Sequence, residues 1–320
     1  MDIFLHIVGN NIVPIFLLIG IGFVVSRKFE IDIKTLSKIN FYIFVPGFVL
    51  VNLYTTEIPL DLLKVLVFAI TFLMVNMLIG SIIAKVRNYD DKLANAYKNS
   101  IMFYNSGNIG IPLITLVFSA SIFTEAQLNL AVTAQIMVMV VQNITTNTIG
   151  FFNADKANMH WKQSIKKILK MPTVYAIPTA LILKWITINT GYDFTEFPGW
   201  PGLEYIRSGL ISIALVSLGV QLSKTKVTLT NKKVYLAVAI RLIGGPIMAV
   251  GLIMLMGFDG VVAQTLMISS SVPTAVNTAL IAVECDNCPD FASQTVMFAT
   301  LLSAITLTFV IFTAGIIFPI

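Results

Sequence analysis

Two short segments combine helix-breaking residues with amide and hydroxyl side chains. The first, 105–112, reads Asn-Ser-Gly-Asn-Ile-Gly-Ile-Pro, and the second, 269–277, reads Ser-Ser-Ser-Val-Pro-Thr-Ala-Val-Asn. Proline removes a backbone N–H and clashes with the carbonyl four residues back, so each segment predicts a broken helix. A half-helix that begins at such a break points free N–H groups and partial positive charge toward it. Two such breaks with amide and hydroxyl side chains are suited to bind a carboxylate.

The positions of the two breaks favour a binding site over a pair of packed kinks, which is the alternative interpretation. Their prolines lie about half the chain apart, and broken helices in matching positions are typical of transporter sites. We expect one half-helix to begin near Pro112 and the other to follow Pro273, capped by Ser270 or Ser271. The candidate substrate-binding residues are Asn105, Asn108, Ile111, Pro112, Ser270, Ser271, Pro273, Thr274 and Asn277.

Three further polar residues within apolar segments are candidates for supporting roles. Arg241 is a charge inside an apolar segment, which is expensive and marks a functional candidate. It could balance a carboxylate, reach the membrane surface, or pair with a backbone carbonyl near the second break. Gln142 and Asn143 could contact the substrate or hold helices together, as such amides often do.

Metal and cofactor chemistry find little support. Cys285 and Cys288 form a C-x-x-C pair, but zinc normally needs four ligands, so we interpret the pair as incidental and predict neither metal nor cofactor. Glu284 could serve a coupling cation or proton, although a solvated helix end is the simpler interpretation. The Gly20/Gly22 and Gly244/Gly245 pairs predict close helix packing.

The composition places these residues in a membrane. The 320 residues are 57% hydrophobic and 12% charged, about half the charge of a soluble domain, and the mean hydropathy is +0.86. A membrane helix needs about 20 apolar residues. We predict an all-α membrane protein with ten spans, at 5–26, 36–55, 62–84, 94–118, 127–152, 171–189, 203–223, 233–257, 260–283 and 291–318.

The basic residues predict the orientation of these spans. All but four of the 21 Lys and Arg residues fall in the segments 27–38, 85–98, 156–170 and 224–233. With ten spans these segments share one side, and cytoplasmic loops collect basic residues. We therefore expect a multi-pass protein of the cell inner (plasma) membrane with both termini outside. The net charge of +5 then reflects topology next to the lipid bilayer, and no nucleic-acid partner is predicted.

The predicted spans divide into two halves of five. Residues 1–152 form the first half, 153–170 a basic cytoplasmic linker, and 171–320 the second half. Because five is odd, the second half starts from the opposite side of the membrane, as in an inverted repeat.

Several motifs carry a resemblance to the auxin efflux carrier family, which includes plant carriers of auxin and bacterial members associated with malate or malonate. The resemblance runs over all ten spans. The matching segments are Asn105–Leu113 in the fourth span, and 241–246, 257–260, 271–274 and 282–284 in the eighth and ninth.

The resemblance implies the fold of the bile-acid:sodium symporters, in which broken helices 4 and 9 cross at their prolines. It also implies an elevator mechanism, with helices 1, 2, 6 and 7 as scaffold and helices 3–5 and 8–10 as the mobile part, and a homodimer. By resemblance, Asn105 matches the substrate-contacting asparagine. The chain lacks the long central loop of the plant carriers, and Thr274 and Asn277 stand where those carriers have Gln and Pro. A small organic acid is therefore favoured over auxin.

The sequence thus predicts a secondary or potential-driven transporter of a small organic anion. A sodium-coupled symporter, or one that uses H⁺, is the alternative within the class, and a channel or sensor is the alternative outside it. No metalloprotease or serine-hydrolase motif is present, which argues against an enzyme, and no P-loop is present to couple ATP.

Overall fold

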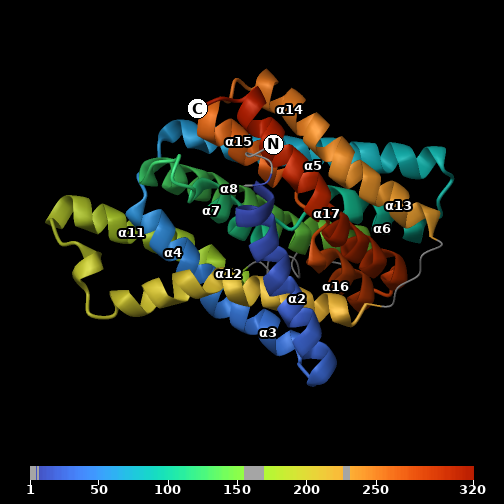
Figure 1. The fold of residues 1–320 in the computed structure, drawn as a ribbon, viewed down its shortest axis with the longest axis horizontal. Helices are drawn as coiled ribbons and strands as arrows, with labels where there is room; N and C mark the ends of the chain where they lie inside the picture. Colours follow the sequence, from blue (N-terminus) through green and yellow to red (C-terminus); the bar gives the residue numbers. More distant parts are fainter. Residues whose placement is uncertain (1–4, 6, 155–168, 226–230) are drawn as a thin grey trace.

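The computed structural model describes residues 5, 7–154, 169–225 and 231–320 (Figure 1). The regular secondary structure of these residues is helical, and they form no strand. Most of the predicted linker 153–170 lies outside the described residues. The elements up to residue 154 are η1 (Val8–Ile12), α2 (Val13–Lys28), α3 (Ile33–Ile39), η2 (Asn40–Phe44), α4 (Val45–Thr55), η3 (Leu60–Leu63), α5 (Lys64–Val86), α6 (Asp91–Met102), η4 (Ser106–Gly110), α7 (Ile111–Phe118), α8 (Glu125–Thr145), η5 (Thr146–Gly150) and α9 (Phe151–Ala154).

The later elements follow in the same style. They are α11 (Pro172–Thr190), η6 (Phe194–Glu196), α12 (Trp200–Ser223), α13 (Lys232–Ala239), η7 (Ile240–Gly244), α14 (Gly245–Leu255), α15 (Gly260–Ser269), α16 (Val276–Glu284) and α17 (Pro289–Ile317).

Seven of the described helices or continuous helix runs are long and apolar enough to cross a membrane. Two other predicted spans are each divided into two shorter helices: one into α6 and η4–α7, the other into α15 and α16. The predicted span at α11, which has 19 residues, is not among the seven. The protein is therefore an all-α, multi-pass membrane protein. The seven spans are Val8–Lys28, Ile33–Thr55, Asp61–Val86, Glu125–Ala154, Trp200–Ser223, Lys232–Leu255 and Pro289–Ile317.

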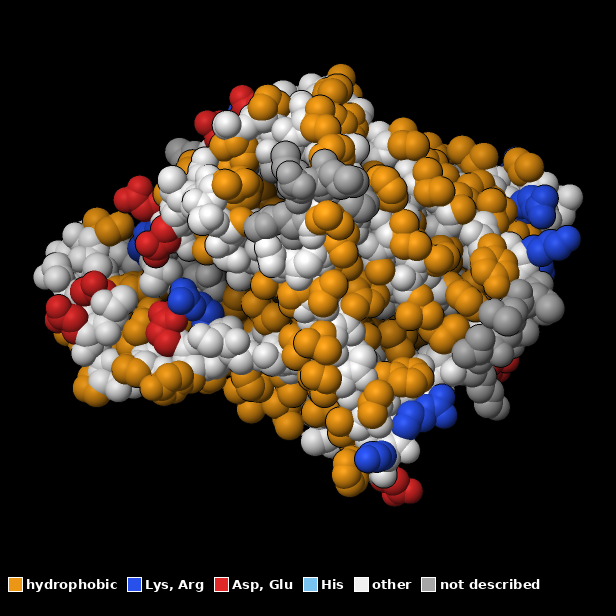
Figure 2. Space-filling model, in the orientation of Figure 1, with side chains coloured by type: hydrophobic (Ala, Val, Ile, Leu, Met, Phe, Trp, Pro, Cys, Tyr) orange, Lys and Arg blue, Asp and Glu red, His pale blue; other side chains and the backbone are white. Residues whose placement is uncertain are grey.

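The surface separates apolar from charged residues as a membrane protein requires. Figure 2 shows hydrophobic side chains over most of the visible face, with most of the visible Lys and Arg toward the right and most of the visible Asp and Glu toward the left. Large apolar side chains on the outer helices are exposed, among them Leu78 at 60% and Ile305 at 60%. Lipid is the environment in which such exposure is favourable.

Four of the helices are interrupted by a turn of π-helix two residues before a proline. In each case the residue that precedes the proline donates its N–H to the carbonyl five residues back. Since proline has no N–H and its ring crowds the carbonyl four residues back, the wider turn accommodates it while keeping the chain helical. The turns are η1, η2, η4 and η7, and the prolines are Pro14, Pro46, Pro112 and Pro246.

Small residues allow the closest helix contacts, as two of the four glycines predicted for this role show. A Cβ added at Gly22 on α2 would lie 2.9 Å from the carbonyl carbon of Val216 on α12. One added at Gly245 would lie 3.2 Å from the backbone carbonyl oxygen of Ser270, at the end of α15. The prediction is wrong for Gly20, where a Cβ would meet open space, and for Gly244, where it would meet only side chains of its own helix, at 3.8 Å or more.

The helices associate in two groups. In one, α2 and α4 pack against α12, and α4 also packs against α11. In the other, α5 packs against α6 and α8, α15 packs against α8 and α17, and α17 also contacts α13 and α16. The two broken helices belong to the second group and meet inside it.

Candidate functional site

The two breaks cross each other in the middle of the second helix group. Tyr104 and Thr274 pair as an isolated antiparallel bridge. The Asn105 N–H donates to the Pro273 carbonyl at 2.8 Å, and the residue after Thr274 donates its N–H to the Phe103 carbonyl at 2.9 Å. The extended backbone of each break therefore provides hydrogen-bond partners for N–H and carbonyl groups of the other. Such pairing allows a non-helical backbone to lie at membrane depth.

The half-helix after the first break begins earlier than predicted. It starts with η4 at Ser106, and Pro112 occupies the second position of the following α7. The reason is that Asn105 acts as the N-cap, with its Oδ1 accepting the Asn108 N–H at 3.2 Å, while the π turn absorbs the proline. The first break thus places two asparagines at a helix start.

The second half-helix also differs from the expectation, because no serine caps it. The N-cap of α16 is Ala275, and its side chain makes no capping bond. The Ser271 hydroxyl instead donates to the Met267 carbonyl of its own helix at 2.6 Å. The first N–H groups of α16 consequently receive no side-chain oxygen at the N-cap.

Two buried amides at the crossing have N–H donors without a partner. Asn105 and Gln142 are 5% and 2% exposed, and their Nδ2 and Nε2 atoms have no hydrogen-bond acceptor. The other end of Gln142 is engaged, since its Oε1 accepts the Tyr104 N–H at 3.3 Å. Buried donors without acceptors are costly, and an anionic ligand would supply the missing acceptor.

These amides line a small space, which we call the narrow chamber. Its volume is about 20 Å³, enough for about one water molecule. Three half-buried asparagines, Asn108, Asn143 and Asn277, line it together with Asn105 and Gln142. The crossing therefore brings five of the predicted polar residues to one place.

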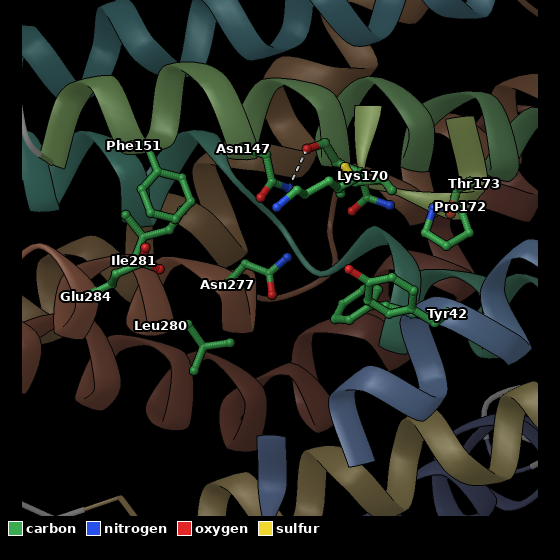
Figure 3. Close-up of a pocket in the computed structure, with 13 residues that line it drawn as sticks. Tyr42, Asn147, Phe151, Lys170, Pro172, Thr173, Asn277, Leu280, Ile281 and Glu284 are labelled. Atoms are coloured by element: carbon green, nitrogen blue, oxygen red, sulfur yellow. Dashed lines mark hydrogen bonds between the residues drawn. The ribbon is translucent and has the colours of Figure 1, made fainter. Parts of the chain in front are cut away.

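A larger space, which we call the wide cavity, lies next to the narrow chamber and shares Phe41, Asn143 and Asn277 with it. Its volume is about 330 Å³, at the lower end of the range for small-molecule pockets. Figure 3 shows Asn277 and Lys170 projecting into this cavity from different elements. A small organic acid fits in the wide cavity but not in the narrow chamber as it stands.

Other predicted residues pack behind the chamber. The Thr274 hydroxyl donates to the Ser100 carbonyl at 2.9 Å, and the Ser270 hydroxyl is fully buried and unpaired. Ile111 and Pro112 are buried in the start of α7. These residues shape the two breaks, and their side chains are outside the lining of both spaces.

Arg241 adopts one of the three arrangements considered for it, the pairing with backbone carbonyls. It is 0% exposed, and its guanidinium donates to the carbonyls of Ile101, at 3.2 Å, and Ser270. It also lies 4.7 Å from the ring centre of Tyr104 and 5.6 Å from that of Phe72. It does not line the chamber or the cavity.

Sequence reasoning missed Asn147 and Lys170, which line the wide cavity. A signal existed for the first, because Asn143 and Asn147 are one helical turn apart and share a face with Thr146 and Gln142. Asn147 donates to the Asn143 carbonyl at 2.9 Å. Lys170 gave no such signal, since it stood among the other basic residues of the linker.

The acidic and sulfur-containing residues near the end of α16 do not form a metal centre. Glu284 lines the wide cavity. Cys285 and Cys288 lie in the turn between α16 and α17 and form no disulfide, and burial raises the pKa of the Cys288 thiol. Over the described ranges, no three His, Cys, Asp or Glu side chains come together in a way that could hold a metal ion.

A buried crossing of broken helices within a multi-pass bundle is the architecture of a membrane transporter. A family model described as "Membrane transport protein" matches residues 7–311, and the chain belongs to this family, the auxin efflux carriers. One relative, an "uncharacterized transporter" from Methanothermobacter thermautotrophicus, is 21% identical over 280 residues, which cover 87% of this chain and 88% of the relative.

Proposed function

We propose that the protein is a secondary transporter of a small organic anion, a carboxylate such as malate or malonate, which binds where the two broken helices cross. The observation that carries this proposal is the pair of buried, unpartnered N–H donors on Asn105 and Gln142. A hydrogen bond to a charged acceptor contributes more than one to a neutral acceptor. A carboxylate is therefore the ligand that best offsets the cost of burying these donors.

The half-helices that follow the two breaks also favour a negatively charged ligand at the crossing. Both η4–α7 and α16 begin at the crossing, so the positive ends of their dipoles face it. No Asp or Glu lines the narrow chamber, so within the described residues no fixed negative charge there opposes an anion.

The transport mechanism we propose is an elevator within ten spans, arranged as two inverted repeats of five. The first helix group, α2, α4, α11 and α12, is the scaffold, and the group with the breaks is the mobile part. Support comes from the helix contacts, which are more extensive within each group than between the groups, where α12 meets η4 and α4 meets α8. One hydrogen bond between them, from Asn40 Nδ2 to Asn108 Oδ1 at 3.1 Å, ends on a residue of the narrow chamber, so ligand binding and movement compete for the same amide.

Sodium coupling and a channel are the competing functions. Glu284 in the wide cavity is the side chain that a sodium symporter or a proton-coupled carrier would use. A channel needs a continuous pore, whereas the chamber at the crossing has a volume of about 20 Å³. A carrier that is closed at its centre accounts for this constriction better than a channel does.

The test is flux of labelled malate, malonate, citrate, lactate and indole-3-acetate into liposomes that contain the purified protein, with and without Na⁺ and a pH gradient. We expect saturable flux of one of these acids. Asn277→Ala should lower that flux about tenfold, which corresponds to a loss of about 1.4 kcal/mol, with little change in thermal stability. Asn105→Ala should lower it similarly, but it should also cost about 1 kcal/mol of stability because Asn105 caps the first half-helix. Asn189→Ala, at an exposed position on α11, is the matched control and should transport normally.

Each outcome bears on a different part of the proposal. Normal flux in both chamber variants would refute the proposed site. Flux that disappears without Na⁺ would replace the proposed mechanism by sodium symport, and flux that does not saturate would favour a channel.

A further inference from the structure

Arg241 is a buried positive charge that no carboxylate neutralises. Its guanidinium has contacts with two backbone carbonyls and two aromatic rings, and its Nε atom has no partner. Among the described residues it forms no ion pair with Asp or Glu. A charge inside a membrane bundle is expensive, so a role beyond packing is expected of it.

The two carbonyls that Arg241 contacts belong to the two halves of the crossing. Ile101 lies in the last turn of α6, and Ser270 is the C-cap residue that follows α15. The C-terminal ends of helices carry partial negative charge. Arg241 therefore offsets the negative ends of both incoming half-helices, while the positive ends of the two outgoing half-helices remain free to act on the chamber.

Arg241 is separated from the narrow chamber by one side chain. Its guanidinium lies over the ring of Tyr104 at 4.7 Å, and Tyr104 lines the chamber. The ring carries no charge that could cancel that of Arg241, and the surrounding protein screens charge less than water does. The positive potential of the guanidinium therefore extends into the chamber.

We infer that Arg241 is a positioning residue that makes the narrow chamber selective for anions without contacting the ligand. It does so by holding both incoming half-helices at the crossing and by supplying a fixed positive potential behind Tyr104. Gly245 is part of the arrangement, since an added Cβ would lie 3.1 Å from the guanidinium and 3.2 Å from the Ser270 carbonyl. The inference rests on the proposed function, which supplies the anionic ligand. Its test measures the potential in the chamber and needs no transported ligand.

The test measures the potential directly with charged thiol reagents. Cys285 and Cys288 are replaced by Ser, and a single cysteine is introduced by Asn277→Cys, which lines both spaces, or by Leu280→Cys, which lines the wide cavity only. Each protein reacts with a methanethiosulfonate that carries either a sulfonate or a trimethylammonium group. The ratio of the anionic to the cationic reaction rate reports the local potential.

We expect the ratio at position 277 to exceed that at position 280 while Arg241 is present. Arg241→Gln should lower the ratio at 277 by about tenfold, because one positive charge acts in opposite directions on the two reagents. Arg241→Lys, which retains the charge, should keep most of the ratio. Lys170→Gln identifies the part contributed by Lys170, which lines the wide cavity.

Two results would overturn the inference. One is an unchanged ratio at position 277 in folded Arg241→Gln protein, and the other is an equal loss in Arg241→Gln and Arg241→Lys. If Arg241→Gln does not fold, the comparison of positions 277 and 280 in the protein with Arg241 decides, and equal ratios there refute the inference. A positive potential without any acid flux would refute the proposed function and leave this inference standing.

Discussion

Replacement of Gln142 by Glu should weaken ligand binding at the crossing while it keeps the hydrogen bond that supports the fold there. The side-chain Oε1 accepts the Tyr104 N–H at 3.3 Å, while Nε2 is buried and unpartnered. Glutamate keeps an acceptor for Tyr104 and replaces the free donor by a negative charge. We therefore expect Gln142→Glu to fold normally and to bind an anion poorly at neutral pH.

The size of the effect follows from the contacts that change. A hydrogen bond to a charged partner contributes about 1.5–3 kcal/mol, and each 1.4 kcal/mol changes an affinity about tenfold. Loss of the Gln142 donor should then raise the apparent KM about 10- to 100-fold, and repulsion by the new carboxylate adds to this. At low pH the carboxyl becomes protonated, so the repulsion disappears, an O–H donor returns, and flux should partly recover.

The matched control lies two turns earlier on the same helix. Gln135 is fully buried. In contrast to Gln142, its amide nitrogen is paired and its amide oxygen is not: Nε2 donates to the Ser106 carbonyl at 2.7 Å, and Oε1 has no partner. Gln135→Glu places a carboxylate against that carbonyl, so it should lower the thermal stability in detergent by more than Gln142→Glu does. The measurements are labelled-acid counterflow in liposomes at pH 7.5 and 5.5, and thermal unfolding. Normal KM in Gln142→Glu, or equal destabilisation by both variants, would refute the reasoning.

Two further predictions concern the first helix group. Gly22→Ala should destabilise the protein by about 1–3 kcal/mol through overpacking against Val216, whereas Gly20→Ala, which faces open space, should not, and equal melting temperatures would contradict this. Tyr54→Phe removes a hydroxyl that donates to Asp193 at 2.9 Å and should lower the melting temperature near neutral pH. Hydrogen bonds from the residue two positions later, and then from Tyr54, hold the pKa of Asp193 below its usual value. This stabilisation is lost as the pH falls through that lowered pKa, so the difference between the two melting temperatures should narrow in acid. The remaining difference comes from the Phe194 N–H, which donates to the Tyr54 hydroxyl at 2.8 Å whatever the charge of Asp193.

The sequence predicted the breaks because their causes are local. Proline, glycine and asparagine act on the backbone within a few residues, so Pro112 and Pro273 marked both segments correctly. The details of capping depended on geometry that the sequence does not display. Asn105 could cap the first half-helix because a π turn widens the chain before Pro112. Ser271 could not cap the second because its hydroxyl reaches back to its own helix.

For contacts between segments that are far apart in the sequence, the sequence alone offered several possible partners and did not choose among them. The sequence left Arg241 open to a ligand, the membrane surface or a backbone carbonyl, because the outcome depends on where α6 and α15 end relative to η7. The cavity residues Asn147 and Lys170 were missed for a related reason. Each becomes part of a lining only when helices far apart in sequence are brought together.

The groups that make the crossing electropositive do not titrate near neutral pH. The donors of Asn105 and Gln142 are amides, the half-helix dipoles belong to the backbone, and the charge of Arg241 is that of a guanidinium, which stays protonated. Among the residues that the structure describes, no carboxylate or histidine lines the narrow chamber. Anion binding there should therefore depend on pH mainly through the ligand, so a proton gradient could drive transport only through a group outside the chamber. Glu284 in the wide cavity is placed where such a group would be needed.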